Sequence, residues 1–315
     1  MSAFTVPTLD YQDFLSSEEA PRRNFVAQLN QALHRIGFFV LKNHGVNLHL
    51  LDAAYAAADE FFLLPYAQKS AYEIPGLAGQ RGFVSFGREI AKDETRPDLK
   101  EFWQIGRDYV PASASGRKGP PNIWPKALPK FREIFAGMYQ QLDACSMVLL
   151  EACGQALAEP STRFSSLAAE GESILRVLHY PPVAKGSVGV RSAAHEDINL
   201  ITLLCQASSG GLEIKTHDGS WHEVLAPRHY LIVDTGDMMQ NLTNGYFKST
   251  THRVVNPPDE SSRRYSFPFF CHPRSECRLD PLPSCIAKTG GAAKFPAIVA
   301  GAYLQQRLQE IGLAL

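Results

Sequence analysis

Two histidines and one carboxylate in this chain have the residue types and the spacing of a metal-binding triad. His195 and Asp197 are separated by a single residue, and His252 lies further along the chain, at the start of a short apolar run. Imidazole and carboxylate groups bind Fe(II), Mn(II), Co(II) or Zn(II), and three such ligands on one face of an ion leave other positions open. An isolated His-x-Asp pair is more often a polar strand end, so the metal interpretation depends on the residues that follow His252.

A basic side chain and a hydroxyl group beyond this histidine could hold a carboxylate. Arg264 and Ser266 are also separated by one residue, so both would point to the same face of a strand. A guanidinium binds a carboxylate through two parallel hydrogen bonds, and a serine hydroxyl adds a donor. A hydrolytic zinc site needs a bound water and a nearby base, whereas an iron site with open positions can bind a small keto acid next to this pair. The pattern therefore favours iron.

Strand periodicity must bring the three metal ligands together. His195 and Asp197 precede a run of strand-forming residues at 199–205, so we expect both to lie at the mouth of a strand and to point the same way. His252 would open a second strand. A third strand over 265–270 would carry the arginine and the serine on one face and aromatic side chains on the other.

Helical and strand signals divide the chain into two halves. Apolar residues at helical spacing predict helices over about 25–36, 47–64, 129–156 and 296–311. From residue 174 onward, short runs and turn residues predict strands, with a hairpin at Asp218-Gly219 and turns at Gly236-Asp237 and Asn244-Gly245. Many short strands joined by such turns indicate a sandwich or barrel.

The composition is that of a globular protein without a bulk attraction to polyanions. Its 315 residues, 45% of them apolar, can bury one large core or two modest ones. A net charge of −1 and a pI near 6.8 predict neither a nucleic-acid partner nor a membrane partner. Without an 18-residue apolar run or a basic-then-apolar N-terminus, we expect a cytoplasmic chain. The six cysteines form no Cys-x-x-Cys pair, so we expect reduced thiols and no zinc ribbon.

The chain resembles the isopenicillin N synthase-like branch of the Fe(II)/2-oxoglutarate-dependent dioxygenases, in its bacterial form. The similarity covers almost the whole chain and rests on VPTLD at 6–10, GFFVLKNHGV at 37–46, LHYPP at 178–182, HED at 195–197, GDMMQ at 236–240, STTHRV at 249–254 and RYS at 264–266. It implies a mixed α and β fold whose double-stranded β-helix core (a cupin-like jelly roll) has flanking N-terminal and C-terminal helices. The implied regions are an N-terminal dioxygenase region at 1–120, a long linking helix at 121–170, the jelly-roll core at 171–280 and a C-terminal helix at 281–315.

The resemblance also implies roles for single residues. The implied catalytic metal ligands are His195, Asp197 and His252. Arg264 and Ser266, assisted by Tyr180, would hold the distal carboxylate of the co-substrate 2-oxoglutarate. The implied reaction uses O2, with ascorbate as an optional reductant, and couples oxidative decarboxylation of 2-oxoglutarate to hydroxylation, desaturation or cyclisation of a small metabolite. Leu178 departs from the pattern, because many plant members have an asparagine there that donates a hydrogen bond to the co-substrate.

Two other functions fit parts of this pattern. One is an iron oxidase of the isopenicillin N synthase type, which uses no 2-oxoglutarate, and the other is a non-catalytic jelly-roll protein with a structural metal ion. In the resembling enzymes the segment around 81–103 covers the metal site, and its candidates for substrate contact are Arg81, Phe83, Arg88 and Trp103. The arginines there, together with Arg191, favour a small-molecule substrate with an anionic group. No feature of the sequence indicates an oligomeric state.

Overall fold

A computed structural model describes residues 4–77, 79–91, 95–108, 119–183, 189–205, 207–257, 259, 261–311 and 313 of the chain. Its helices are α1 (Tyr11–Leu15), α2 (Glu19–Arg35), α3 (Leu48–Phe62), α4 (Tyr66–Ser70), α5 (Pro129–Ala156), α6 (Thr162–Ala168), α7 (Asp237–Leu242), α8 (Pro283–Lys288) and α9 (Ala300–Glu310). Its strands are β1 (Thr8–Asp10), β2 (Phe38–Lys42), β3 (Gly82–Val84), β4 (Glu101–Gly106), β5 (Ile174–Tyr180), β6 (Ser192–His195), β7 (Ile201–Cys205), β8 (Leu212–Lys215), β9 (Trp221–Glu223), β10 (Leu231–Thr235), β11 (His252–Val254) and β12 (Arg264–Cys271).

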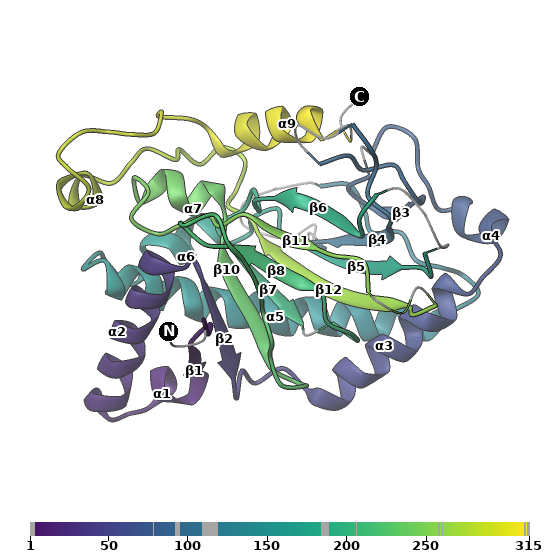
Figure 1. Cartoon of the computed structure of the whole chain (residues 1–315), viewed down its shortest axis with the longest axis horizontal. Helices are drawn as coiled ribbons and strands as arrows, with labels where there is room; N and C mark the ends of the chain where they lie inside the picture. The colour runs from purple at the N-terminus through teal and green to yellow at the C-terminus, as the bar shows by residue number, and fades with distance from the viewer. Residues whose placement is uncertain are drawn as a thin grey trace.

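The strands form two sheets that pack against each other as a jelly roll (Figure 1). The large sheet has the order β1-β2-β10-β7-β12-β5-β4-β3, and the small sheet has the order β6-β11-β8-β9. Both sheets contribute to a small apolar cluster that includes Tyr180 and Ile232 from the large sheet and Ile214 and Val254 from the small one. The predicted double-stranded β-helix core is therefore confirmed.

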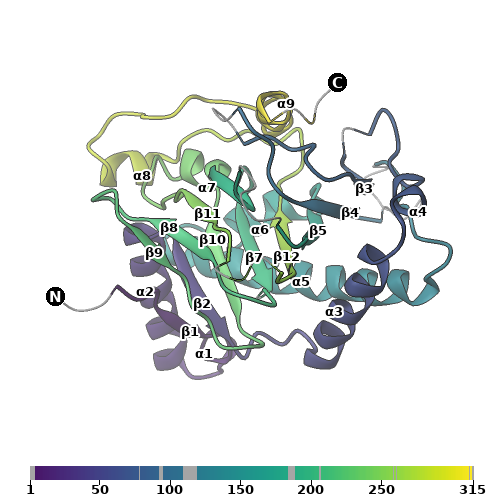
Figure 2. The ribbon, with the colours of Figure 1, turned by 45° about the vertical axis from the view of Figure 1, so that its right-hand side comes forward.

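Helices cover the outer face of the large sheet, and the main hydrophobic core lies between them and the strands (Figures 1 and 2). Helix α5 runs along this face with an apolar stripe that repeats at helical spacing. Its Phe135 contacts Phe267 of β12, and its Tyr139 contacts Phe269. As predicted, the odd-numbered aromatic residues of β12 face the helices, so the arginine and serine of this strand face the interior of the jelly roll.

Strands from the N-terminal region complete the large sheet on both sides. β2 pairs antiparallel with β10, and β4 pairs antiparallel with β5. Gly37, just before β2, has a φ of +76°, and a side chain there would meet the carbonyl oxygen of Lys248. A glycine is therefore required where β2 enters the sheet. The segments expected as regions 1–120 and 171–280 thus share one continuous sheet.

The long elements agree with the sequence, whereas several short ones do not. The helix predicted over 129–156 is α5 at the same residues, and the predicted hairpin is formed by β8 and β9. Gly236-Asp237 is not a simple turn, because Asp237 begins helix α7. The last predicted helix begins at Ala300 rather than near 296, and α8 was not predicted at all. Helices of six residues carry too little periodicity to be recognised in a sequence.

Two further expectations concern cysteines and membranes. All six cysteines lie in described parts of the chain, and they are buried and free of disulfide bonds, as predicted. Among the described helices, none has both the length and the apolar character needed to span a bilayer.

Candidate active site

Two of the three predicted metal ligands lie on neighbouring strands of the small sheet, and the third, Asp197, lies two residues beyond the first of these strands. His195 ends β6 and His252 begins β11, and the two residues are register partners in this antiparallel pair. Oδ1 of Asp197 lies 3.9 Å from Nε2 of His195 and 3.8 Å from Nε2 of His252, and the three donor atoms lie within 4.8 Å of one another. Glu196, between the first two ligands, instead accepts a hydrogen bond from Thr251. Two imidazole nitrogens and one carboxylate oxygen therefore converge on one point, which fits a divalent ion.

Backbone carbonyl groups hold both imidazoles in the orientation that a metal requires. Nδ1 of His195 lies 2.7 Å from the carbonyl oxygen of Ala193, and Nδ1 of His252 lies 3.1 Å from that of Thr250. Because a carbonyl oxygen only accepts, Nδ1 carries the proton in each ring and Nε2 keeps its lone pair for the ion. Burial, and then the neighbouring His195, lower the pKa of His252 to about 4, so its imidazole is neutral near pH 7.

A buried hydrogen-bond chain orients the carboxylate of Asp197. Thr202 in β7 donates its hydroxyl proton to Oδ2 of Asp197, and the amide of Asn199 donates to the same hydroxyl oxygen at 2.9 Å. Oδ1 is thereby left to face the two imidazoles. Asp234 in β10 is the register partner of Thr202, and burial followed by the charge of Asp197 raises the pKa of Asp234. Second contacts of this kind tune a metal ligand and fix its geometry.

Two strands of the large sheet place the predicted carboxylate-binding residues together. Arg264 in β12 is the register partner of Tyr180 in β5, with its guanidinium carbon 5.0 Å from the centroid of that ring. Tyr180, Arg264 and Ser266 are each 2% exposed, and we call them the carboxylate site. Nε of Arg264 donates to the carbonyl oxygen of Ser209 at 3.2 Å, but its Nη1 has no hydrogen-bond partner among the described residues. A buried guanidinium nitrogen without an acceptor is costly, so this position suits an anionic ligand.

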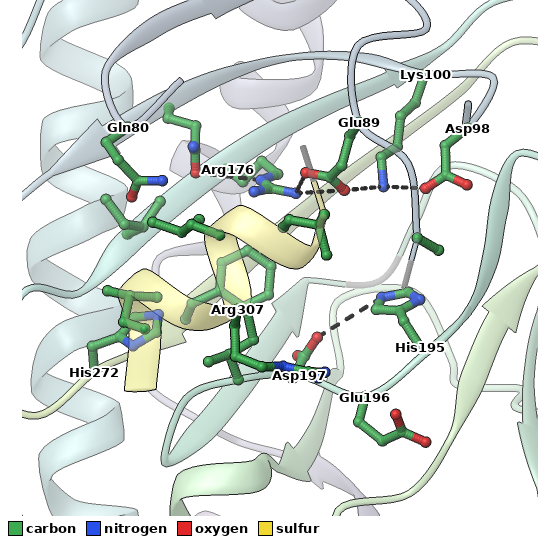
Figure 3. Close-up of a pocket in the computed structure, with 18 of the residues that line it drawn as sticks. Gln80, Glu89, Asp98, Lys100, Arg176, His195, Glu196, Asp197, His272 and Arg307 are labelled. Carbon is green, nitrogen blue, oxygen red and sulfur yellow. Dashed lines mark hydrogen bonds and ion pairs between the residues drawn. The ribbon is translucent and has the colours of Figure 1, made fainter. Parts of the chain in front are cut away.

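A cavity of about 290 Å³ lies beside the metal ligands (Figure 3). His195 and Asp197 form one side of it, and its apolar lining includes Ala91, Ile174, Phe270, Leu304, Leu308 and Ile311. Helix α9 covers the cavity, and its Tyr303 and Arg307 contact the carboxylate of Asp237 at 3.0 and 3.6 Å. The backbone N–H of Asp237 donates to the carbonyl oxygen of Asp197 at 2.7 Å, which connects the covering helix to a metal ligand. The residues of the carboxylate site do not line this cavity.

A chain of alternating charges forms the wall opposite the metal ligands (Figure 3). Arg176 contacts Glu89 at 2.9 Å, Glu89 contacts Lys100 at 2.6 Å, and Lys100 contacts Asp98 at 2.7 Å. We call these four residues the ionic wall. Burial alone would raise the pKa of Glu89, but the charges of Arg176 and Lys100 outweigh it and lower this pKa to about 2. The wall therefore carries two positive and two negative charges, each compensated by a neighbour.

The ionic wall is also hydrogen-bonded to β6, the strand that carries His195. Oδ1 of Asp98 accepts a hydrogen bond of 2.9 Å from the backbone N–H of Ala193 in β6. His272, which follows β12, lines the same cavity with an Nδ1 that has no partner in the described structure. Burial lowers the pKa of His272 to about 4, so its ring is neutral near pH 7 and can donate or accept a hydrogen bond.

The four side chains predicted to contact substrate do not line this cavity. Phe83 and Trp103 are 1% and 0% exposed and pack in the main core, where both contact Phe61. Arg81 is buried against Gly106, and Arg88 is largely exposed beside Glu73 at 3.8 Å. Neither arginine belongs to the cavity lining. Side chains alternate along a strand, so in β4 it is Gln104, next to Trp103, that reaches the cavity.

The residues of the ionic wall were missed in the sequence. Glu89, Asp98 and Lys100 lie in an irregular segment, where no periodicity indicates which side chains face inward. Arg176 did leave a signal, because it is a charged residue between the apolar pairs Ile174-Leu175 and Val177-Leu178 of strand β5. A charge inside a buried strand needs a partner or a ligand, and this could have marked Arg176 as a site residue.

Comparisons with known proteins agree with this geometry. Residues 6–127 match the family model described as non-haem dioxygenase in morphine synthesis N-terminal, and residues 171–273 match that of the 2OG-Fe(II) oxygenase superfamily. The proline hydroxylase buaE of Petromyces alliaceus is 31% identical, with 96% of this chain and 98% of that protein covered. A 2OG-Fe(II) oxygenase family protein from Caulobacter crescentus is 36% identical, with a TM-score of 0.85 over 97% of this chain and 98% of that one. A full-length Neurospora crassa protein, solved in complex with alpha-KG and thymine, is 28% identical, with a TM-score of 0.85 over 96% of each chain.

Proposed function

The chain belongs to the 2OG-Fe(II) oxygenase superfamily, and from this premise we propose a role for each part of its active site. The protein is a 2-oxoglutarate-dependent dioxygenase, an oxidoreductase that uses Fe(II), 2-oxoglutarate and O2. We propose that the Fe(II) ligands are His195, Asp197 and His252. We propose that the distal carboxylate of 2-oxoglutarate binds the carboxylate site formed by Tyr180, Arg264 and Ser266. The similarity to the Caulobacter crescentus protein supports the inference that this is a bacterial form of the family.

One observation on Arg264 carries the assignment of the co-substrate. Arg264 is 2% exposed, lacks a partner at Nη1 and forms no ion pair with an acidic residue of the described structure. A fully buried, uncompensated guanidinium is expected where an anionic ligand supplies the missing charge. The converging donor atoms of the triad and this arginine together fit a metal-bound keto acid whose second carboxylate is also recognised.

The residues of the site position the reactants and protect them from water. When bound, iron supplies the O2 activation that couples oxidative decarboxylation of 2-oxoglutarate to oxidation of a substrate C–H bond. Ala193 and Thr250 keep the ligand imidazoles in one tautomer, and Thr202 keeps one carboxylate oxygen of Asp197 directed at the ion. Arg264 orients the co-substrate through the distal carboxylate of that molecule, and α9 covers one side of the substrate cavity, which limits the access of water.

We further propose that the substrate is a small polar molecule without net negative charge. The anionic substrate expected from the sequence relied on Arg81, Arg88 and Arg191, and none of these lines the cavity. The ionic wall that does line it is internally balanced, so it offers no surplus positive charge. It does offer hydrogen-bonding groups, with His272 facing it from another side. Two similar proteins support this class, one named a proline hydroxylase and one solved with thymine, because neither proline nor thymine carries a net negative charge.

Substrate screening by succinate release tests this proposal. The Fe(II)-loaded protein is incubated with 2-oxoglutarate, isotope-labelled O2 and two substrate panels, one of neutral or zwitterionic polar metabolites and one of carboxylates with a net negative charge. We expect succinate to form in proportion to a hydroxylated product with one labelled oxygen atom, and only with the first panel. Turnover only of the substrates with a net negative charge would contradict the proposed substrate class. O2 consumption without succinate would instead favour the isopenicillin N synthase type of oxidase. Asp197→Ala serves as the inactive control.

A further inference from the structure

A second arginine, Arg191, is buried without a compensating charge in the interior of the jelly roll. Arg191 lies directly before β6 and is 0% exposed. Its Nη2 donates to the carbonyl oxygen of Ser262 at 2.5 Å, whereas its Nε and Nη1 have no hydrogen-bond partner among the described residues. Within that part of the chain, no acidic side chain forms an ion pair with it.

Arg107 shows how the hydrogen-bond donors and the charge of a structural arginine are paired in this protein. Nε of Arg107 donates to the carbonyl oxygen of Gly171 at 2.9 Å, and its two Nη atoms donate to the carboxylate of Asp143 at 3.0 and 2.7 Å. Every nitrogen of that guanidinium thus has an acceptor, and the charge is neutralised. Arg191 is more deeply buried and has one acceptor in place of three, so packing alone does not account for it.

A second positive charge, that of Arg264, makes the burial of Arg191 less favourable still. The guanidinium carbon of Arg191 lies 5.9 Å from the centroid of the Tyr180 ring, and that of Arg264 lies 5.0 Å from the same centroid. Burial, and then the positive charge of Arg264, lower the pKa of Arg191. Two like charges buried around one tyrosine repel each other unless an anion lies close to both.

We propose that Arg191 is a second guanidinium for the distal carboxylate of 2-oxoglutarate and makes the protein selective for dicarboxylic keto acids. The inference rests on the proposed role of Arg264 and extends the carboxylate site by one residue. A carboxylate has about four lone-pair sites, so it can accept from the free Nη1 of Arg264 and from the two free nitrogens of Arg191. A donor on each side would also offset the loss of the asparagine that Leu178 replaces.

Ligand binding without turnover tests this role. The Fe(II)-loaded protein is titrated under anaerobic conditions with 2-oxoglutarate and with 2-oxopentanoate, which has a methyl group in place of the distal carboxylate. Binding is followed by the charge-transfer absorption of the metal-chelated keto acid and by calorimetry. The variants are Arg191→Gln, Arg191→Lys and Arg264→Gln, and Arg107→Gln is the matched control for losing a structural guanidinium.

We expect Arg191→Gln to weaken 2-oxoglutarate binding by about 10- to 100-fold, as for the loss of hydrogen bonds to a charged group. Binding of 2-oxopentanoate should change less than about twofold, because that ligand lacks the carboxylate that Arg191 is proposed to bind. Arg191→Lys keeps the charge but not both free N–H groups of the guanidinium. It should therefore lower the preference for 2-oxoglutarate over 2-oxopentanoate by at least about threefold. Arg107→Gln should alter neither affinity.

The outcomes separate this proposal from the one on which it rests. Unchanged 2-oxoglutarate affinity in Arg191→Gln, or an equal loss for both keto acids, would overturn the role of Arg191. If Arg191→Gln does not fold, the Arg191→Lys protein decides, and an unchanged preference for 2-oxoglutarate overturns the role. If Arg191→Gln weakens 2-oxoglutarate selectively while Arg264→Gln has no effect, Arg191 binds the carboxylate and the assignment of Arg264 is wrong.

Discussion

The hydroxyl group of Thr202 should control metal affinity although it does not contact the metal. Thr202 is 2% exposed and donates to Oδ2 of Asp197, while Asn199 donates to the same hydroxyl at 2.9 Å. Thr202→Val keeps the shape of the side chain but removes this link. The carboxylate of Asp197 would then lose the contact that directs Oδ1 at the two imidazoles.

The expected magnitude has two parts. Loss of an outer partner of a metal ligand typically weakens metal binding by about 10- to 100-fold, which corresponds to about 1.4 to 2.8 kcal/mol. Two buried groups, Oδ2 of Asp197 and the amide of Asn199, would also lose a partner, which costs about 1–3 kcal/mol of unfolding free energy for each group. The substitution should therefore lower both metal affinity and stability.

Anaerobic calorimetric titration with Fe(II), together with urea unfolding, measures the two effects. Thr235→Val is the matched control, because Thr235 is also buried but donates to the carbonyl oxygen of Lys248 at 2.7 Å. We expect this control to lose stability and to keep its Fe(II) affinity. Unchanged Fe(II) affinity in Thr202→Val, with a normal loss of stability, would refute the idea that this hydroxyl orients the ligand.

Three further predictions concern the cavity and its surroundings. The pKa of Glu89 is lowered to about 2 from an ordinary 4.5, which contributes stability that is present above pH 4.5 and is lost as the pH falls towards 2. Glu89→Gln should therefore flatten the pH dependence of the free energy of urea unfolding in this range. An unaltered pH profile would contradict the ion pairs assigned to Glu89. Trp103→Ala empties a core position, so it should lower the free energy of unfolding by about 3–5 kcal/mol. The KM for substrate of the folded protein should stay within about twofold of its original value. A larger rise in this KM would instead indicate that Trp103 contacts the substrate. Tyr303→Phe removes a hydrogen bond between α9 and Asp237. It should raise the KM for substrate by up to about tenfold, measured by steady-state kinetics, and leave the Fe(II) affinity unchanged, measured by metal titration.

The metal ligands could be predicted because each depends on a local rule. Residues i and i+2 of a strand share a face, so His195 and Asp197 could be paired without knowing the fold, and the same rule paired Arg264 with Ser266. The structure confirms that His195, Asp197 and His252 converge, and it adds the register between β6 and β11 that the sequence does not contain. The helix at 129–156 was equally predictable, since its apolar stripe repeats over many turns.

The substrate cavity could not be predicted, because its walls come from distant segments that meet only in the folded chain. The ionic wall combines an irregular loop with Arg176 of β5, and α9 covers the cavity from near the other end of the sequence. Trp103 was selected because the resemblance implied that its segment covers the metal site, whereas alternation along β4 directs Gln104, and not Trp103, to the cavity. The chemistry of the metal site follows from the chain alone, since ligand types and two-residue spacing are local properties. The fold sets which charges surround the substrate and which arginine nitrogens lack an acceptor among the described residues, because burial and charge compensation depend on every segment that packs around them.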